Sequence, residues 1–174
     1  MMSSISGALG LNASPTTGNL APYHTLFHFL FAYVVLSSRF TKIRLKIDHN
    51  VNPRGDVTKY GARAVQEGKM SQRQFNFLQR NEGCHANSME HFPVFASAAL
   101  FATTAGVETS SINVACAAYT ISRIIYAISY LVIEKHQLTY IRSLAWWASN
   151  FACIRLFWAA GQAMNVSSAV KPLI

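Results

Sequence analysis

The chain has 174 residues, of which 51% are hydrophobic and only 13% are charged, and its formal net charge is +8. Soluble domains typically carry about 25% charged residues, so this deficit indicates a protein that faces lipid rather than water. A nucleic-acid partner is not expected, because the basic residues are not interleaved with aromatic residues on a polar face. They concentrate between two apolar segments, which is typical of the cytoplasmic side of a membrane protein.

The N-terminal part of the chain combines a polar tail with the first apolar segment. Residues 1–21 are rich in Ser, Gly, Thr and Asn and lack a basic segment before an apolar core, so they are expected to form a loose tail. Tyr23–Ser38 is long enough, with its flanks, to span a bilayer. His24 and His28 have the spacing of a metal pair but no further ligand nearby, so we interpret them as interfacial histidines and expect no metal site.

A long polar connection, residues 41–74, follows the first apolar segment. It contains eight basic and three acidic residues, and Asn52-Pro53-Arg54-Gly55 marks a turn inside it. The excess of Lys and Arg predicts that this connection is cytoplasmic.

Three further apolar segments complete the chain: Phe75–Ala105, Ile112–Ile133 and Leu144–Met164. The first of their two connections contains no Lys or Arg and the second is basic, so they are expected on opposite sides of the membrane. We predict an all-α integral membrane four-helix bundle over residues 22–165, a C-terminal tail over residues 166–174, and both termini in the lumen. Glycosylation sequons at Asn12 and Asn165 agree with this orientation. Pro93 is expected to kink the second helix.

The second apolar segment begins with a polar stripe. At helical spacing one face carries Arg80, Gly83, Asn87 and Glu90. Burying an arginine, an amide and a carboxylate at the end of a helix long enough to span a membrane costs free energy. Such residues are therefore expected to have a function.

The third and fourth segments bring more polar residues to the same side. Arg123, Tyr126 and Tyr130 share one helical face, and Glu90 is the best carboxylate partner for Arg123. Arg142 and Ser143 open the fourth segment. Polar side chains can also serve only to hold membrane helices together, and each interacting pair then contributes about 1 kcal/mol or less to helix association.

This group contains more polar residues than helix association requires, so we interpret it as a binding site. Several arginines favour a ligand with carboxylates, because guanidinium pairs with them bidentately. A peptide-like zwitterion with a carboxylate at each end, such as glutathione, meets this description. The lipid boundary would admit an apolar co-substrate.

These motifs resemble those of the MAPEG family, the membrane-associated proteins of eicosanoid and glutathione metabolism. The resemblance rests on Asn87-Ser-Met-Glu90-His-Phe-Pro93, Arg123-Ile-Ile-Tyr126-Ala-Ile-Ser-Tyr130 and Ile141-Arg142-Ser143, and it extends over residues 23–163. It implies a homotrimer in the endoplasmic reticulum membrane with glutathione bound between subunits on the cytosolic side.

The resemblance also implies roles for single residues. Asn87 and Glu90 would hold the glutathione backbone, and Arg123, Tyr126 and Tyr130 would surround its carboxylates. The implied catalytic residues are Arg142 over the sulfur, Ser143 beside it and Tyr126. His85 has a match in some members.

One position departs from the family pattern. Members that bind glutathione usually carry an arginine four residues before the Asn, and here that position is Gly83. Either Arg80, one turn earlier, reaches the same carboxylate, or the site takes no glutathione.

Three functions therefore remain open. The first is a glutathione-dependent transferase or peroxidase that acts on lipophilic electrophiles. The second is a glutathione-independent isomerase or cyclase of an apolar metabolite that uses Arg, Tyr and His as acid–base groups. The third is a non-catalytic lipid-binding scaffold.

Overall fold

The computed structural model describes residues 18–170, with side chains described for residues 18–166. This part of the chain contains helices and no strand, which confirms the predicted all-α class. The helices are α2 (Ala21–Leu30), which continues as a π-helical segment (Phe31–Val35), α3 (Ser38–Arg44), α4 (Asp56–Gln66), α5 (Gln72–Thr104), α6 (Thr109–Val132), a 3-10 turn (His136–Leu138) and α7 (Tyr140–Val170). Residues 1–17 of the predicted tail, with the Asn12 sequon, lie outside the described residues.

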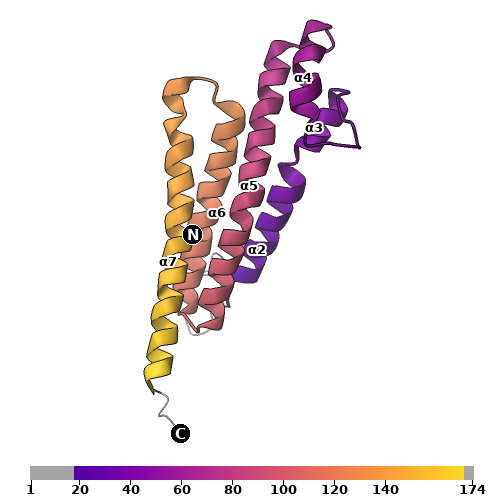
Figure 1. Ribbon diagram of the computed structural model, residues 1–174. Coiled ribbons are helices and arrows are strands. Elements are labelled where there is room, and N and C mark those ends of the chain that lie inside the picture. Colours follow the sequence, from indigo (N-terminus) through magenta and orange to yellow (C-terminus); the bar gives the residue numbers. More distant parts are fainter. Residues whose placement is uncertain (1–17, 171–174) are drawn as a thin grey trace.

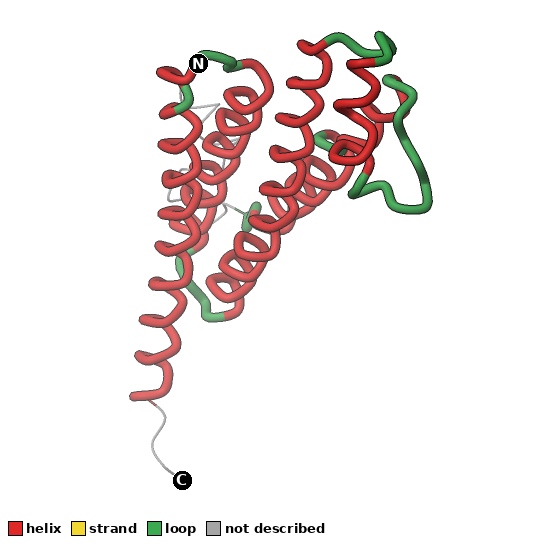
Figure 2. Tube along the Cα trace, turned by 45° about the horizontal axis from the view of Figure 1, so that its top comes forward, coloured by secondary structure: helices red, strands yellow, loops and turns green. Residues whose placement is uncertain are grey.

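The four longer stretches α2, α5, α6 and α7 run side by side, and α7 extends beyond the others at its C-terminal end (Figure 1). The short helices α3 and α4 lie beside the first half of α5, and an irregular loop joins them (Figure 2). The molecule therefore has an elongated helical body with a polar cap at one end.

Two stretches of the described chain are long and apolar enough to cross a membrane: Ala21–Arg44 and Thr109–Val132. They correspond to the first and third predicted spans. The other two long helices carry polar residues within their length, the stripe around Asn87 in α5 and Asn150 with Arg155 in α7. Crossing by all four helices remains a prediction.

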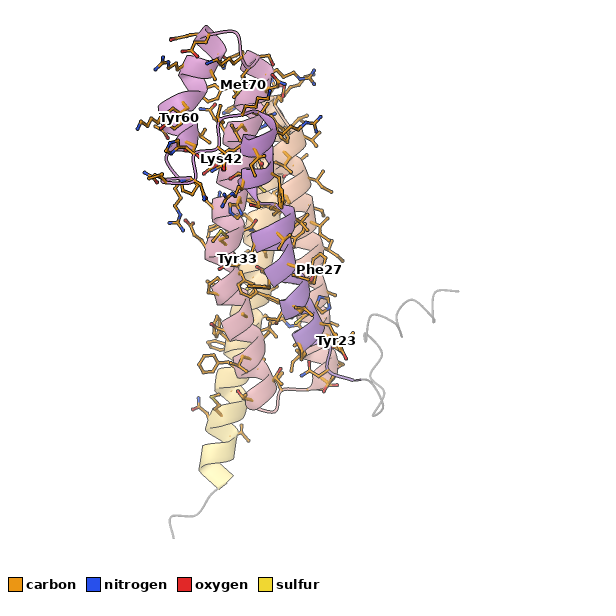
Figure 3. All side chains as sticks on the ribbon, turned by 90° about the vertical axis from the view of Figure 1, so that its right-hand side faces the viewer. Tyr23, Phe27, Tyr33, Lys42, Tyr60 and Met70 are labelled. Carbon is orange, nitrogen blue, oxygen red and sulfur yellow. The ribbon has the colours of Figure 1, made fainter. Side chains whose placement is uncertain are left out.

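The polar connection is more ordered than the sequence analysis predicted, because it contains α4. Apolar residues of α4 and its flanks form a small core with α5, made of Ile47, Val57, Ala64, Met70 and Leu78. Figure 3 shows Lys42, Tyr60 and Met70 in this cap, and Tyr23, Phe27 and Tyr33 along the first helix. The cap is a folded part of the protein.

The fifth helix links the cap to the helical body. A reciprocal capping box starts it, in which the Ser71 hydroxyl accepts from the Gln74 amide at 3.2 Å and the Gln74 side chain accepts from the Ser71 amide at 2.8 Å. The helix passes through Pro93 without a break. At 1.5 Å per residue its 33 residues extend roughly 50 Å, beyond the ~30 Å hydrocarbon layer of a bilayer. Its polar first half is therefore long enough to stand at the membrane boundary.

The main core lies in the half of the body nearest the α5–α6 loop. Phe95 and Tyr119 stack face to face, with ring centroids 3.9 Å apart, and small residues such as Ala98 and Ala115 surround them. His28 packs edge-on against Tyr119 and lies 3.0 Å from the Thr120 hydroxyl. His28 is 4% exposed. It is a partnered histidine inside the helical body.

Candidate functional site

Four of the predicted site residues form one group between α6 and α7. This arginine–tyrosine cluster consists of Arg123, Tyr126, Tyr130 and Arg142. The Arg123 guanidinium carbon lies 4.3 Å from the centre of the Tyr126 ring, and that of Arg142 lies 4.3 Å from the Tyr130 ring. The two rings are 5.5 Å apart, so cations and aromatic rings form a continuous chain. Each cation–π contact contributes about 0.5–2 kcal/mol, depending on exposure.

The sequence explains why these side chains meet. Arg123, Tyr126 and Tyr130 are spaced i, i+3 and i+7 on α6, so one helical face carries all three. Arg142 lies in the first turn of α7, and the short connection after α6 turns that end back beside Tyr130. Two antiparallel helix ends thus build the cluster.

Arg123 is the most deeply buried member of the cluster, at 2% exposed. One of its terminal nitrogens donates to the Ser88 hydroxyl at 3.1 Å and, more weakly, to the Asn87 carbonyl at 3.4 Å. The other is buried with no hydrogen-bond partner within the described chain. Glu90 is exposed and forms no ion pair with Arg123, so that predicted pairing is wrong.

A buried guanidinium without a carboxylate is energetically unfavourable, because it has lost water and gained only part of its hydrogen bonds. An anionic ligand would supply the missing acceptor. The orphaned Arg123 nitrogen is therefore consistent with a carboxylate-bearing ligand such as glutathione.

Gly83 packs directly against the cluster. A Cβ atom at this position would lie 2.8 Å from the Tyr130 hydroxyl, closer than van der Waals contact allows. The Tyr130 phenol thus lies against the backbone position at which the resemblance implies an arginine. The Asn87 side-chain amide donates to the Gly83 carbonyl at 2.8 Å, within its own helix.

The structure places the remaining predicted residues elsewhere. Arg80 forms an ion pair with Glu134 at 2.8 Å and lines a different cavity, so it lies outside the cluster. Ser143 is exposed beside Arg142. Glu90 and His85 lie on a cavity formed by the end of the first helix, α3 and α5.

This second cavity, which we call the mixed-charge cavity, has a volume of about 570 Å³. Its walls include Arg39, Lys42, Glu82, His85 and Glu90. Lys42 is 3% exposed, and its ammonium group donates to the Pro53 carbonyl at 2.6 Å and lies 3.4 Å from Glu82. Small-molecule sites commonly measure about 300–1,000 Å³, so the volume suits a ligand of that kind.

An apolar groove of about 560 Å³ runs between α2 and the second half of α5. Leu26, Phe29, Phe92 and Leu100 are among the residues that line it. A lipophilic molecule could lie in such a groove, and none of the described residues that line it is charged.

Sequence reasoning missed Ser88, the one side chain that accepts a hydrogen bond from Arg123. The sequence does contain a pattern that indicates this face of α5. Residues at spacings of four, three and four positions are all buried: Cys84, Ser88, His91 and Phe95. This stripe faces α6 at the level of Arg123, whereas the neighbouring stripe contacts α6 through Gly83, which packs against Tyr130, and leaves Glu90 exposed.

The fold and the cluster together define an all-helical membrane protein with a basic, aromatic site at one end of its apolar helices. The MAPEG family model matches residues 23–162. The chain therefore belongs to the MAPEG family, as the motifs predicted, and is a membrane protein of the glutathione- and eicosanoid-related class. No curated protein and no solved structure gives a significant match.

Proposed function

We propose that this protein is a membrane-bound, glutathione-dependent transferase or peroxidase that acts on a lipophilic electrophile. The single observation that carries the proposal is the arginine–tyrosine cluster, in which one buried nitrogen of Arg123 has no acceptor within the described chain and Arg142 is held over Tyr130. The proposed protein has four membrane spans and works in the endoplasmic reticulum, with the site facing the cytosol.

The proposal includes a homotrimer, for a geometric reason. Arg123 meets the Ser88 side of α5, whereas Glu90 and His85 line the mixed-charge cavity on another side of the same helix. We propose that one glutathione molecule contacts both groups by binding between two subunits. Glu90 and His85 of one subunit would then face Arg123, Tyr126, Tyr130 and Arg142 of the next. Asn87 would hold the ligand backbone beside Arg123 of its own subunit, which donates to the Asn87 carbonyl.

Bound glutathione would supply a thiol, whose pKa is near 8.5 when it is free in water. The Arg142 guanidinium stabilises negative charge on a nearby sulfur and so favours the nucleophilic thiolate at neutral pH. Tyr130 fixes Arg142 by stacking, and Tyr126 and Ser143 offer hydroxyl groups to charge that develops on the electrophile. In the transfer reaction a sulfur–carbon bond forms while the bond to the leaving oxygen or halide breaks. Arg123 neutralises a ligand carboxylate.

A glutathione titration of the detergent-purified protein tests this proposal, with heat and thiolate absorbance recorded together. We expect binding with a thiolate signal at neutral pH, loss of that signal in Arg142→Ala, and an unchanged signal in Lys135→Ala. Lys135 is an exposed cation outside the cluster, so it controls for loss of charge. No binding at millimolar glutathione would refute the proposal.

A second function, a glutathione-independent isomerase or cyclase, is favoured by one observation. The Tyr130 hydroxyl fills the space next to Gly83, where an arginine would otherwise bind a glutathione carboxylate. The cluster would then provide acid–base groups for an apolar metabolite that reaches it from the surrounding lipid. Turnover of such a substrate without glutathione would identify this function, and lipid binding without turnover would identify a scaffold.

A further inference from the structure

A third cavity lies at the polar end of the molecule, apart from the arginine–tyrosine cluster. It has a volume of about 580 Å³ and opens where α3, the start of α5 and the end of α6 meet. We call it the arginine pocket. Its charged residues are Arg44, Arg73, Arg80 and Glu134, and its apolar residues include Phe40, Phe77, Leu131 and Val132.

The pocket has more positive charge than its own acid neutralises. Arg80 pairs with Glu134 at 2.8 Å, and the Arg80 Nε atom is buried without an acceptor in the described chain. Arg44 and Arg73 form no ion pair or side-chain hydrogen bond within residues 18–166. Two guanidinium groups therefore lack a protein partner, and guanidinium binds phosphate through parallel hydrogen bonds.

The position of the pocket relative to the apolar helices indicates what supplies that phosphate. Both stretches that are apolar enough to cross a membrane end here, Ala21–Arg44 at Arg44 and Thr109–Val132 at Val132. The arginines thus stand where a bilayer changes from acyl chains to headgroups. Phe40 and Val132, on the rim of the pocket, are 64% and 70% exposed.

We propose that the arginine pocket binds the phosphate headgroup of an anionic membrane lipid. Arg44 and Arg73 contact the phosphate, Arg80 stays paired with Glu134 and donates its free Nε–H, and the acyl chains lie along Phe40 and Val132. A soluble phosphate would leave these exposed apolar side chains uncovered, whereas a lipid covers them. The occupied pocket would hold the folded cap, through α3 and α5, against the bilayer.

Native mass spectrometry of the full-length protein in detergent tests this assignment. Phosphatidylglycerol and phosphatidylcholine of identical chain length are offered together, because they differ in net charge. We expect the wild-type protein to retain at least tenfold more phosphatidylglycerol. Each arginine near a headgroup contributes about 1 kcal/mol, so Arg44→Gln/Arg73→Gln should lower that retention at least tenfold.

The matched control is Arg54→Gln/Lys59→Gln, which removes the same charge from exposed positions outside the pocket. It should retain the lipid as the wild type does. An equal loss of phosphatidylglycerol retention in both double variants would mean that the basic surface attracts the lipid in general. That outcome would overturn the proposal.

Two further outcomes would overturn the proposal with the wild-type protein alone, so the test does not depend on whether the variants fold. Equal retention of phosphatidylcholine would show that the pocket does not recognise charge. Displacement of the lipid by millimolar inorganic phosphate would assign the pocket to a soluble anion instead.

Discussion

The two halves of the α5–α6–α7 assembly are packed differently: apolar side chains fill one half, and arginine and tyrosine side chains meet in the other. Near the α5–α6 loop, Phe95, Ala98 and Cys116 are fully buried, and the stacked Phe95 and Tyr119 rings fill the centre. Near the other end, the same helices meet through Arg123, Tyr130 and Arg142, and a buried donor of Arg123 has no acceptor. One half is closed by its own apolar packing, and under the proposed function a ligand would complete the other.

This difference separates stability from the proposed function along the same three helices. Apolar burial with small neighbours gains free energy from close packing. A buried guanidinium that lacks a carboxylate loses free energy until a ligand arrives. Substitutions in the two halves should therefore change different measured quantities.

The largest effect is expected from Phe95→Ala in the apolar half. Removal of a fully buried aromatic ring leaves a cavity and should lower the free energy of unfolding by about 3–5 kcal/mol. Denaturant unfolding in detergent micelles measures the loss. Leu100→Ala on the same helix, where the side chain is 64% exposed, should cost under about 1 kcal/mol. Equal losses for the two variants would contradict the assignment of this core.

In the polar half, Arg123→Met should affect ligand binding and stability in opposite directions. Loss of the buried cation should weaken glutathione binding by about 2–3 kcal/mol, which is roughly 30- to 150-fold. The thermal midpoint should stay constant or rise, because an apolar side chain of similar length avoids the desolvation penalty. Calorimetric titration and thermal unfolding of one preparation measure both. Arg155→Met, at an exposed position on α7, serves as the control. A lower midpoint with unchanged affinity would make Arg123 a structural residue.

Two helical glycines provide a smaller and more specific comparison. Gly161→Ala on α7 should stabilise the protein by about 0.5–1 kcal/mol, because nothing lies within 4 Å of the added methyl group and alanine favours the helix. Gly83→Ala gains the same propensity but places the methyl group 2.8 Å from the Tyr130 hydroxyl. We expect no stabilisation and a weakened contact between Tyr130 and Arg142.

Thermal unfolding and glutathione affinity of the two alanine variants test this comparison. Equal stabilisation by both substitutions, with unchanged affinity, would show that Tyr130 moves freely and that its position beside Gly83 does not matter.

Periodicity in the sequence was sufficient to predict the three long helices α5, α6 and α7 and the shared face of Arg123, Tyr126 and Tyr130. The first predicted span is divided instead into α2, a π-helical segment and the start of α3. It could not predict which face of one helix meets another. The Glu90–Arg123 pairing failed for this reason, since α5 turns the Ser88 stripe toward α6. The contact between Arg142 and Tyr130 likewise depends on how α7 returns beside α6.

Composition concealed the folded cap. The excess of Lys and Arg in residues 41–74 indicates a cytoplasmic connection. Composition does not show that apolar residues within this connection recur at helical spacing. Val57 and Ala64 are one heptad apart on α4 and are both buried, which is the pattern of an amphipathic helix. The cap also contains ion pairs that composition alone cannot place.

The smallest effect is expected at one of these pairs, on the water-facing side of the cap. Glu67 accepts hydrogen bonds from Lys69 and from Arg63, both at 2.6 Å, and these bonds lower its pKa from about 4.5 to about 2. A carboxyl group whose pKa is lower in the folded state stabilises that state above the unfolded pKa and loses this contribution as pH falls. The thermal midpoints of the wild type and Glu67→Gln should thus differ slightly at pH 7, and the difference should vanish between pH 4.5 and pH 2. Because exposed ion pairs contribute little, a large difference at pH 7 would mean that the cap, and not only the apolar half, determines the stability of the protein.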